Sequence, residues 1–200
     1  GKPKGVMLKH EGIANYLTAH ECNPQVQIVK ENGTCYGSVT TVSFDMNLKE
    51  TAVALCNGLT LAFASDEMTM DPVLLANFFM ENHVDVFNAT PSRLLVYMEV
   101  PEFARAMKHC KVILSGGEKY PDKLLQVLRE QTDARIINTY GPTEITVSCN
   151  AMELTHANTI SVGKPLYNYV EYIVDIDDNK LPAHVVGELL IGGVGVARGY

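Results

Sequence analysis

The chain has 200 residues, of which 46% are hydrophobic and 20% are charged, and its formal net charge is −7. These values are typical of a globular protein with one or two domains and a sizeable core. They argue against a nucleic-acid-binding surface, which would carry clustered Lys and Arg. No apolar run reaches about 18 residues, so no membrane span is expected, and the opening residues do not form an export signal.

Cysteine and histidine are scattered along the chain. The five cysteines have no CxxC spacing: Cys22, Cys35, Cys56, Cys110 and Cys149. An odd, dispersed set predicts free thiols in a reducing compartment, and therefore a cytoplasmic protein. The six histidines are equally dispersed and indicate no zinc site. The chain opens in a Gly/Lys/Pro loop and stops at Tyr200 without a terminal helix, so we expect an internal piece of a longer protein.

Residues 1–9 predict a loop that runs into an apolar stretch. Lys2 and Lys4 bracket a proline, and Gly5 follows. Glycine lets backbone N–H groups approach an anion, and lysine can neutralise phosphate charge, although no Walker A pattern is present. Solvent-exposed lysines on a loop remain the alternative interpretation.

Short apolar strands alternate with amphipathic helices over residues 35–139. The residue pattern predicts strands at 35–44, 59–64, 85–88, 111–114 and 134–139, with 59–64 buried. It predicts helices at 11–18, 47–56, 71–82, 91–98 and 121–129, and an irregular segment at 21–33. This alternation is typical of an α/β fold with a largely parallel sheet covered by helices on both faces.

Asp45 and Asn47 stand at the start of the predicted 47–56 helix. Either side chain can cap that helix, and Asn47 with Glu50 has the spacing of a capping box. The alternative is that Asp45 faces a pocket and binds a cation such as an ammonium group. The residue pattern leaves both interpretations open.

Polar residues gather at the predicted carboxyl ends of the strands, where ligands bind in parallel sheets. They are Asp45, Asn88, the segment 115–117 and the segment 138–144. In the last segment Thr143 can donate to a phosphate oxygen, and Glu144 can hold Mg²⁺, which needs few carboxylates when phosphate oxygens are present. A strand-to-loop corner with polar caps is the competing interpretation.

The pattern changes after Glu144, where strands follow one another without long helices between them. Residues 170–174 and 185–191 predict two such strands, and Asp177 to Asn179 predict a hairpin-type turn. The glycines at 192, 193 and 195 lack the following helix that a dinucleotide fingerprint requires. We therefore expect an α/β unit over residues 1–155 and a β-rich unit over residues 156–200.

Four stretches occur in a specific order: GKPKGVM at 1–7, FD at 44–45, NTYGPTE at 138–144 and GELLIGGVGVARGY at 187–200. This order resembles the adenylation domains of non-ribosomal peptide synthetases, in the adenylate-forming superfamily with acyl-CoA ligases and firefly luciferase. The resemblance covers essentially the whole chain. It implies a flavodoxin-like layered subdomain followed by the start of a smaller, barrel-like subdomain.

The resemblance implies amino-acid activation with ATP and Mg²⁺, followed by thioester transfer to the phosphopantetheine arm of a carrier protein. By position, the residues implied for catalysis are Lys4, Thr143 and Glu144, with Mg²⁺ on Glu144. Those implied for ATP or AMP binding are Gly117, Glu118, Asn138, Tyr140 and Thr143. The parent protein would also contain carrier-protein and condensation domains, and neither nucleic acid nor membrane is expected as a partner.

The same resemblance assigns Asp45 to the substrate α-ammonium group. The implied amino-acid pocket consists of Asp45, Met46, Lys49, Asn88, Leu114, Gly116, Thr139, Val147 and Ser148. A lysine in this pocket favours an acidic or amide-bearing substrate side chain, provided that no protein group neutralises it. Alternatively, Lys49 points out of its helix into solvent.

Parts of the family pattern are absent from the sequence. They are the Ser/Thr/Gly-rich front of the phosphate loop, the ribose-binding aspartate, and the mobile C-terminal domain with its catalytic lysine. The chain alone is therefore expected to adenylate weakly or not at all. Two rival functions stay open: a ligase that joins a non-amino-acid carboxylate to CoA or a carrier protein, and a nucleotide-binding module without catalysis.

Overall fold

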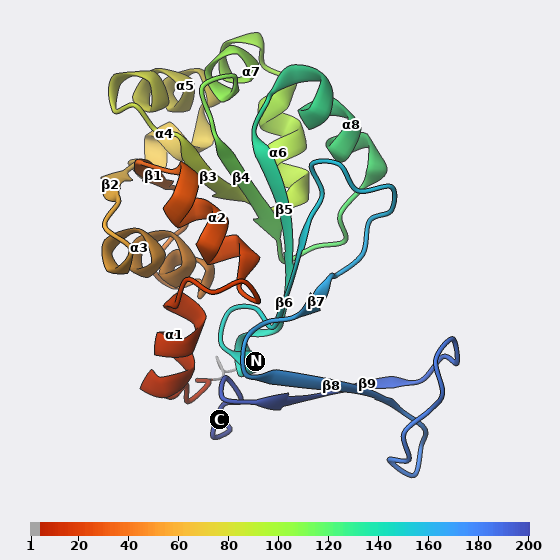
Figure 1. The fold of residues 1–200 in the computed structure, drawn as a ribbon. Coiled ribbons are helices and arrows are strands. Elements are labelled where there is room, and N and C mark those ends of the chain that lie inside the picture. Colours follow the sequence, from red (N-terminus) through yellow and green to blue (C-terminus); the bar gives the residue numbers. More distant parts are fainter. Residues whose placement is uncertain (1–4) are drawn as a thin grey trace.

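The computed structural model describes residues 5–200, so the predicted phosphate-loop residue Lys4 lies outside the described residues. The described chain has a seven-stranded sheet flanked by helices, followed by a two-stranded antiparallel sheet (Figure 1). The fold is the predicted α/β architecture with a mostly parallel sheet.

The strands of the large sheet lie in the order β2-β1-β3-β4-β5-β6-β7. Their bounds are β1 Cys35–Ser38, β2 Thr60–Phe63, β3 Val86–Ala89, β4 Val112–Gly116, β5 Arg135–Tyr140, β6 Asn150–Glu153 and β7 Lys164–Pro165. The first five strands pair in parallel, whereas β6 and β7 are antiparallel. The carboxyl ends of β3, β4 and β5 therefore meet at one edge, which faces the base of the small sheet (Figure 1).

Helices cover both faces of the sheet. The helices α1 His10–Leu17, α2 Pro24–Asn32 and α3 Met46–Cys56 cover one face. The other face carries α4 Asp66–Met70, α5 Pro72–Glu81, α6 Pro91–Met98, α7 Pro101–Met107 and α8 Asp122–Gln131. Because side chains alternate along a strand, Val86 and Val112 pack towards α2 and α3, while Phe87 and Ile113 pack towards α5–α8.

Three predictions about local structure were wrong. Residues 24–32 form a helix instead of an irregular segment, because Pro24 occupies its first turn and Val26 and Val29 share a buried face. Strand β1 ends at Ser38 instead of continuing to residue 44, and a turn follows it. Strand β2 is not buried, because it lies at the sheet edge with Thr60 and Phe63 exposed.

The predicted start of α5 is confirmed. The Asp71 carboxylate accepts hydrogen bonds from the backbone N–H groups of Val73 at 2.8 Å and Leu74 at 3.3 Å, and Pro72 fills the first helical turn. Proline also opens α2, α6 and α7. The sequence predicted the starts of α5 and α6, whereas the segment of α2 was predicted to be irregular and α7 was not predicted.

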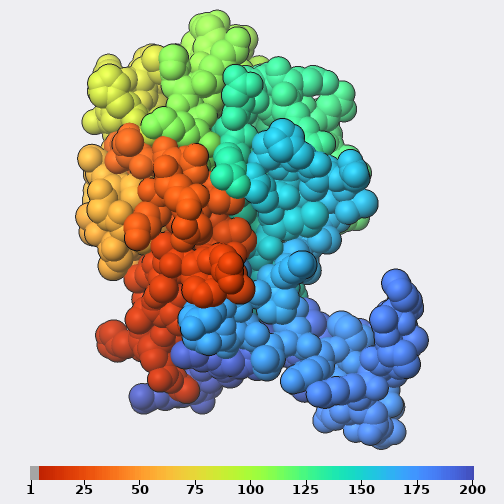
Figure 2. Space-filling model, in the orientation of Figure 1, coloured from red at the N-terminus to blue at the C-terminus, as the bar shows by residue number. Residues whose placement is uncertain are grey.

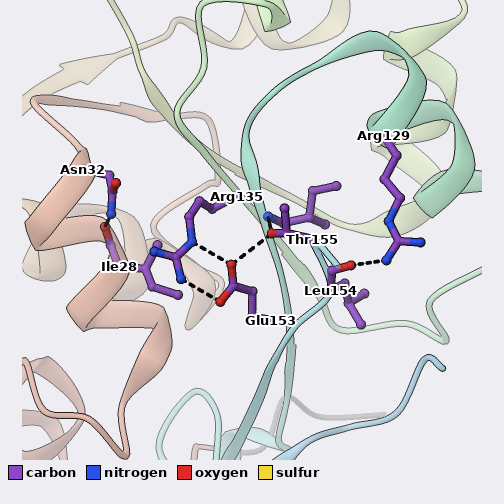
Figure 3. Close-up of polar contacts among 8 residues, drawn as sticks. Ile28, Asn32, Arg129, Arg135, Glu153, Leu154 and Thr155 are labelled. Atoms are coloured by element: carbon purple, nitrogen blue, oxygen red, sulfur yellow. Dashed lines mark hydrogen bonds and ion pairs between the residues drawn. The ribbon is translucent and has the colours of Figure 1, made fainter. Parts of the chain in front are cut away.

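An ion pair ties β5 to β6 far from the carboxyl edge. Figure 3 shows the Arg135 guanidinium on the Glu153 carboxylate, with two contacts of 2.6 Å. The Thr155 hydroxyl donates to Glu153 at 3.0 Å, and Arg129 donates to the carbonyl of Leu154. Such bidentate geometry fixes orientation, so this cluster sets the register of the antiparallel strand β6.

The small sheet pairs β8 Tyr169–Val174 with β9 Glu188–Gly193. This hairpin extends from the body of the molecule as an arm, visible in Figures 1 and 2. The large sheet continues as far as β7, and the small sheet begins at Tyr169. The division between residues 155 and 156 stays a prediction. No helix within residues 5–200 is long and apolar enough to cross a membrane.

Candidate active site

Three neighbouring hollows follow the carboxyl edge of the large sheet. The wide hollow, about 930 Å³, is lined by Gly117, Glu118, Lys119, Tyr120, Asp122, Asn138, Thr139, Tyr140, Gly141, Pro142 and residues 158–162. The inner pocket, about 180 Å³, is lined by Phe44, Asp45, Met46, Lys49, Gly116, Gly117, Thr139, Gly141, Pro142, Thr143, Val147 and Ser148. The outer hollow, about 570 Å³, is lined by Val6, Ser43, Phe44, Asp45, Thr143, Glu144 and Tyr200.

Neighbouring hollows share lining residues, so the three lie side by side along the carboxyl edge. Gly117 and Thr139 line both the wide hollow and the inner pocket. Asp45 and Thr143 line both the inner pocket and the outer hollow. Glu144 lines the outer hollow together with Asp45, so the two carboxylates open onto the same side of the molecule.

Lys49 is buried in the inner pocket with 2% of its surface exposed, and it does not point into solvent. Its Nζ donates to the Thr139 hydroxyl at 2.7 Å, and that hydroxyl donates to the carbonyl of Ser115 at 3.2 Å. Burial lowers the pKa of Lys49 to about 7, although the nearby carboxylates of Glu50 and Asp45 favour its charged form. The pocket therefore contains an amine that holds its proton less tightly than an exposed lysine does.

Glu50 is fully buried and holds the connection between β1 and α3. Its carboxylate accepts from the hydroxyls of Ser38 at 2.9 Å and Thr40 at 2.5 Å, and from the backbone N–H groups of Val39 and Thr40 at 3.0 Å each. Asn88 Nδ2 donates to it at 3.2 Å. The sequence suggested only a capping box, and this role was missed because its donors lie on another strand and a turn.

Asp45 occupies the N-cap position of α3, but its side chain makes no capping hydrogen bond. Asn47 does not cap through a capping box either, because its Nδ2 donates to the carbonyl of Thr40 at 2.8 Å. The structure therefore disagrees with the capping interpretation of both residues. Asp45 instead borders two of the hollows.

Not every residue of the implied amino-acid pocket lines it. Asn88 and Leu114 are paired neighbours on β3 and β4 and lie buried outside the lining of the inner pocket. The Oδ1 atom of Asn88 has no hydrogen-bond partner among the described residues. A Cβ atom on Gly116 would lie 2.4 Å from the Thr139 hydroxyl, so only glycine leaves Thr139 room to receive Lys49.

Four of the five implied nucleotide-binding residues line the wide hollow, namely Gly117, Glu118, Asn138 and Tyr140. The fifth, Thr143, lines the inner pocket and the outer hollow. Asn138 donates from Nδ2 to the carbonyl of Ser161 at 2.8 Å, and Tyr140 is 38% exposed. The Glu118 carboxylate accepts from the backbone N–H of Ser92 at 3.0 Å and from its hydroxyl at 2.9 Å. Glu118 therefore also stabilises the start of α6.

Thr143 and Glu144 lie in the 3₁₀ helix η1, Thr143–Ile145. The Tyr200 hydroxyl donates to the Glu144 carboxylate, and the Ala197 N–H donates to the Glu144 carbonyl at 2.8 Å. Residues 5–200 contain no group of three or more His, Cys, Asp or Glu side chains that suits a metal. A single carboxylate at the wall of the outer hollow still suits Mg²⁺, which takes most of its ligands from phosphate and water.

A cleft along the carboxyl edge of a mostly parallel sheet defines a class of α/β proteins that bind ligands at their strand ends. The family model described as "AMP-binding enzyme" matches residues 1–200, so the chain belongs to the AMP-binding enzyme family.

Two much longer synthetases are among its relatives. The chain is 34% identical over 203 residues to malpinin synthetase of Mortierella alpina, and 33% identical over 213 residues to tyrocidine synthase 3 of Brevibacillus parabrevis. Both matches cover 100% of this chain, but only 2% and 3% of the relatives' own lengths.

Solved structures of adenylation domains have the same fold. The four-domain non-ribosomal peptide synthetase holo-AB3403, bound to AMP and glycine, matches with a TM-score of 0.87 and 31% identity over 100% of this chain and 15% of its own. The N-terminal subdomain of Klebsiella oxytoca NpsA, in complex with 3-hydroxybenzoyl-AMSN, matches with a TM-score of 0.82 and 25% identity over 100% of this chain and 49% of its own.

Proposed function

We propose that this chain forms the nucleotide- and substrate-binding part of an amino-acid-activating adenylation domain in a longer peptide synthetase. The observation that carries the proposal is the outer hollow, which Asp45 and Glu144 both line. An amino-acid carboxylate oxygen attacks the α-phosphorus of ATP, the bond to pyrophosphate breaks, and aminoacyl-AMP forms. The thiol of a carrier-bound phosphopantetheine then attacks the acyl carbon, AMP leaves, and the thiol proton passes to solvent.

Each hollow takes one part of the reactants in this proposal. The wide hollow binds adenine, with Tyr140 offering an aromatic face and Asn138 an amide, while Gly117 and Glu118 bound the ring. The inner pocket takes the amino-acid side chain. Asp45, at the junction of the inner pocket and the outer hollow, pairs with the α-ammonium group.

The outer hollow receives the phosphates. Thr143 donates its hydroxyl to the α-phosphate, and Glu144 ligates Mg²⁺, which supplies charge neutralisation to the phosphate oxygens. Lys4 contributes positive charge from the phosphate loop. The role of Glu144 as the metal ligand is supported by its position in the same hollow as Asp45 and Thr143.

The substrate side chain is acidic or amide-bearing in this proposal. When Lys49 is protonated, it donates one N–H to Thr139 and has two more that a ligand can accept. Ser148 adds a hydroxyl to the pocket wall. The lining is therefore rich in donors. An acceptor-bearing side chain satisfies these donors, whereas an apolar one would leave the Lys49 donors unpaired at a cost in binding.

Pyrophosphate exchange across the common amino acids tests this proposal in the enzyme that contains this chain. We expect exchange with an acidic or amide-bearing amino acid, and loss of that exchange in Asp45→Ala. Exchange with apolar amino acids alone would contradict the proposed side-chain class. Exchange with no amino acid would contradict the proposed reaction.

A second candidate, a ligase for an aromatic carboxylic acid, is favoured by one observation. The NpsA subdomain in complex with 3-hydroxybenzoyl-AMSN has a similar fold. An acid without an α-amino group needs no carboxylate at position 45, so activity that survives Asp45→Ala would favour this second candidate.

A further inference from the structure

The turn that links η1 to β6 has an unusual backbone conformation. After Ile145, the residues Thr146 and Val147 both have φ of 64°. Left-handed values are rare for β-branched residues and persist only where surrounding contacts enforce them. The segment 143–148, called the 143–148 turn below, lines the outer hollow at its start and the inner pocket at its end.

The base of the β8–β9 hairpin makes hydrogen bonds to three consecutive residues of this turn. The Tyr169 hydroxyl, at the start of β8, donates to the carbonyl of Ile145 at 3.0 Å. The Thr146 hydroxyl donates to the carbonyl of Gly195 at 2.7 Å, just beyond β9. The Ala197 N–H donates to the carbonyl of Glu144 at 2.8 Å.

The two contacts made by side-chain hydroxyls are buried. Tyr169 is 6% exposed and Thr146 is 1% exposed, so water does not compete for their hydrogen bonds. Burial raises the pKa of Tyr169 to about 12, and its hydroxyl therefore remains a donor at neutral pH.

Packing leaves the turn little freedom on either side. A Cβ atom on Gly195 would lie 1.9 Å from the Tyr169 hydroxyl and 2.7 Å from the Ile145 carbonyl. On the other side, a Cβ atom on Gly12 of α1 would lie 3.0 Å from the Thr146 hydroxyl. The turn is therefore enclosed between α1 and the hairpin base.

We propose that Tyr169 and Thr146 are positioning residues that hold the 143–148 turn against the hairpin base and so set the shape of the inner pocket. This inference rests on the proposed amino-acid activation. When one of these two hydroxyls is removed, the turn relaxes from its left-handed conformation. Val147 and Ser148 then no longer form a fixed pocket wall. Substrate selectivity then falls together with affinity.

The test compares Tyr169→Phe and Thr146→Val with the wild type in the enzyme that contains this chain. We expect the KM for the preferred amino acid to rise about three- to tenfold, the size of one lost buried hydrogen bond. The ratio of kcat/KM between the preferred and next-best amino acids should fall by a similar factor. Thr146→Ser keeps the hydroxyl and should restore both values.

Hydrogen–deuterium exchange gives a second readout that needs no substrate. The backbone N–H groups of Ser148 and Cys149 donate at 2.8 Å to the carbonyls of Thr146 and Tyr140. Peptides that cover this turn should exchange faster in Tyr169→Phe and Thr146→Val. Tyr172→Phe, which changes an exposed tyrosine on the same strand, should leave the turn's exchange and the selectivity unchanged.

The outcomes separate this inference from the proposed function. If the wild type exchanges pyrophosphate with no amino acid, the proposed function fails, and the deuterium data alone decide whether the two hydroxyls hold the turn. If the wild type is active and both variants keep their KM, selectivity and turn protection, the positioning role is wrong, even if their thermal stability falls.

Discussion

At the scale of single residues, the buried Lys49 lowers the stability of the fold but offers a charge that can bind a substrate. Its ammonium group is buried against the Thr139 hydroxyl, and burial lowers its pKa to about 7. A buried charge without a direct ion pair costs folding free energy. The same charge can be offset by an anionic ligand, so the cost is consistent with a group that is retained for binding.

Lys49→Met should therefore stabilise the fold. At about pH 6 both the folded and unfolded states carry the Lys49 proton, so the whole burial cost applies and the gain should be about 1–4 kcal/mol. As pH rises from about 7 towards the unfolded pKa of about 10.4, the folded state loses a proton that the unfolded state keeps. Wild-type stability then rises relative to Lys49→Met, and the advantage of the variant shrinks.

Urea unfolding at several pH values measures this difference, with Lys123→Met on the exposed face of α8 as the control. The control should show no such pH-dependent gain. A Lys49→Met variant that is less stable than the wild type at every pH would show that Lys49 is not a buried, uncompensated cation.

The same residue predicts a pH dependence of substrate binding. Below about pH 7 Lys49 is already protonated, and an acidic amino acid binds without proton uptake. Above about pH 7, Lys49 must take up one proton when the substrate binds, so the KM should rise by up to about tenfold per pH unit. Pyrophosphate-exchange kinetics between about pH 6 and 8.5 should show this dependence of the KM on pH for the acidic amino acid. The dependence should be weaker for the amino acid with the corresponding amide side chain, and it should be absent in Lys49→Met.

Glu144→Gln tests the assigned metal ligand. The amide retains the size of the side chain but loses the charge that Mg²⁺ prefers. The Mg²⁺ concentration for half-maximal pyrophosphate exchange should rise at least about tenfold, while the KM for the amino acid changes little. Glu67→Gln, on the exposed side of α4, is the matched control. An unchanged Mg²⁺ requirement in Glu144→Gln would remove this residue from the metal site.

At the scale of secondary-structure elements, a buried carboxylate joins the amino ends of the central strands. Asp85 accepts from the backbone N–H groups of Thr34 at 2.8 Å and Cys35 at 2.9 Å, and from Lys111 Nζ at 2.8 Å. Burial alone would raise the pKa of Asp85, but these donors outweigh it and hold the pKa below its usual value. Asp85 therefore ties together the starts of β1, β3 and β4.

Asp85→Asn should destabilise the protein by about 2–4 kcal/mol at neutral pH, because the amide presents donors to groups that already donate. Since the folded pKa is lowered, the wild-type advantage is full above the unfolded pKa of about 3.9 and is lost as pH falls through the folded value. Denaturant midpoints at neutral and acidic pH check this, with exposed Asp133→Asn as the control. A midpoint equal to that of the control would contradict the account.

Helix and strand prediction from sequence succeeded where local signals were strong. Pro72 and Asp71 fixed the start of α5, and the apolar runs of β3, β4 and β5 identified the central strands. It failed for α2, because the alternating Gln and Val residues after Pro24 hide a helical face that only tertiary packing reveals. The helix and strand propensities of single residues are weak predictors, and tertiary packing overrides them.

At the scale of the whole molecule, the parallel sheet explains why residues far apart in sequence meet. The order of the strands predicted that their polar ends would share one edge, and the neighbouring hollows along that edge agree with that prediction. The five donors to Glu50 and the contacts of Tyr169 and Gly195 with the 143–148 turn were not predictable. They depend on how separate elements dock, which no local residue pattern encodes.

The central claim is that Asp45 and Glu144 border one cleft that holds an aminoacyl adenylate. Calorimetric titration of the enzyme with a non-hydrolysable aminoacyl-adenylate analogue, and with its counterpart lacking the α-amino group, tests this claim most directly. We predict that Asp45→Ala weakens the amino analogue at least about tenfold, the size of a charge-assisted contact, and leaves the des-amino analogue unchanged. Equal affinities of the wild type for both analogues, or an Asp45→Ala variant that binds the amino analogue as tightly as the wild type, would contradict it.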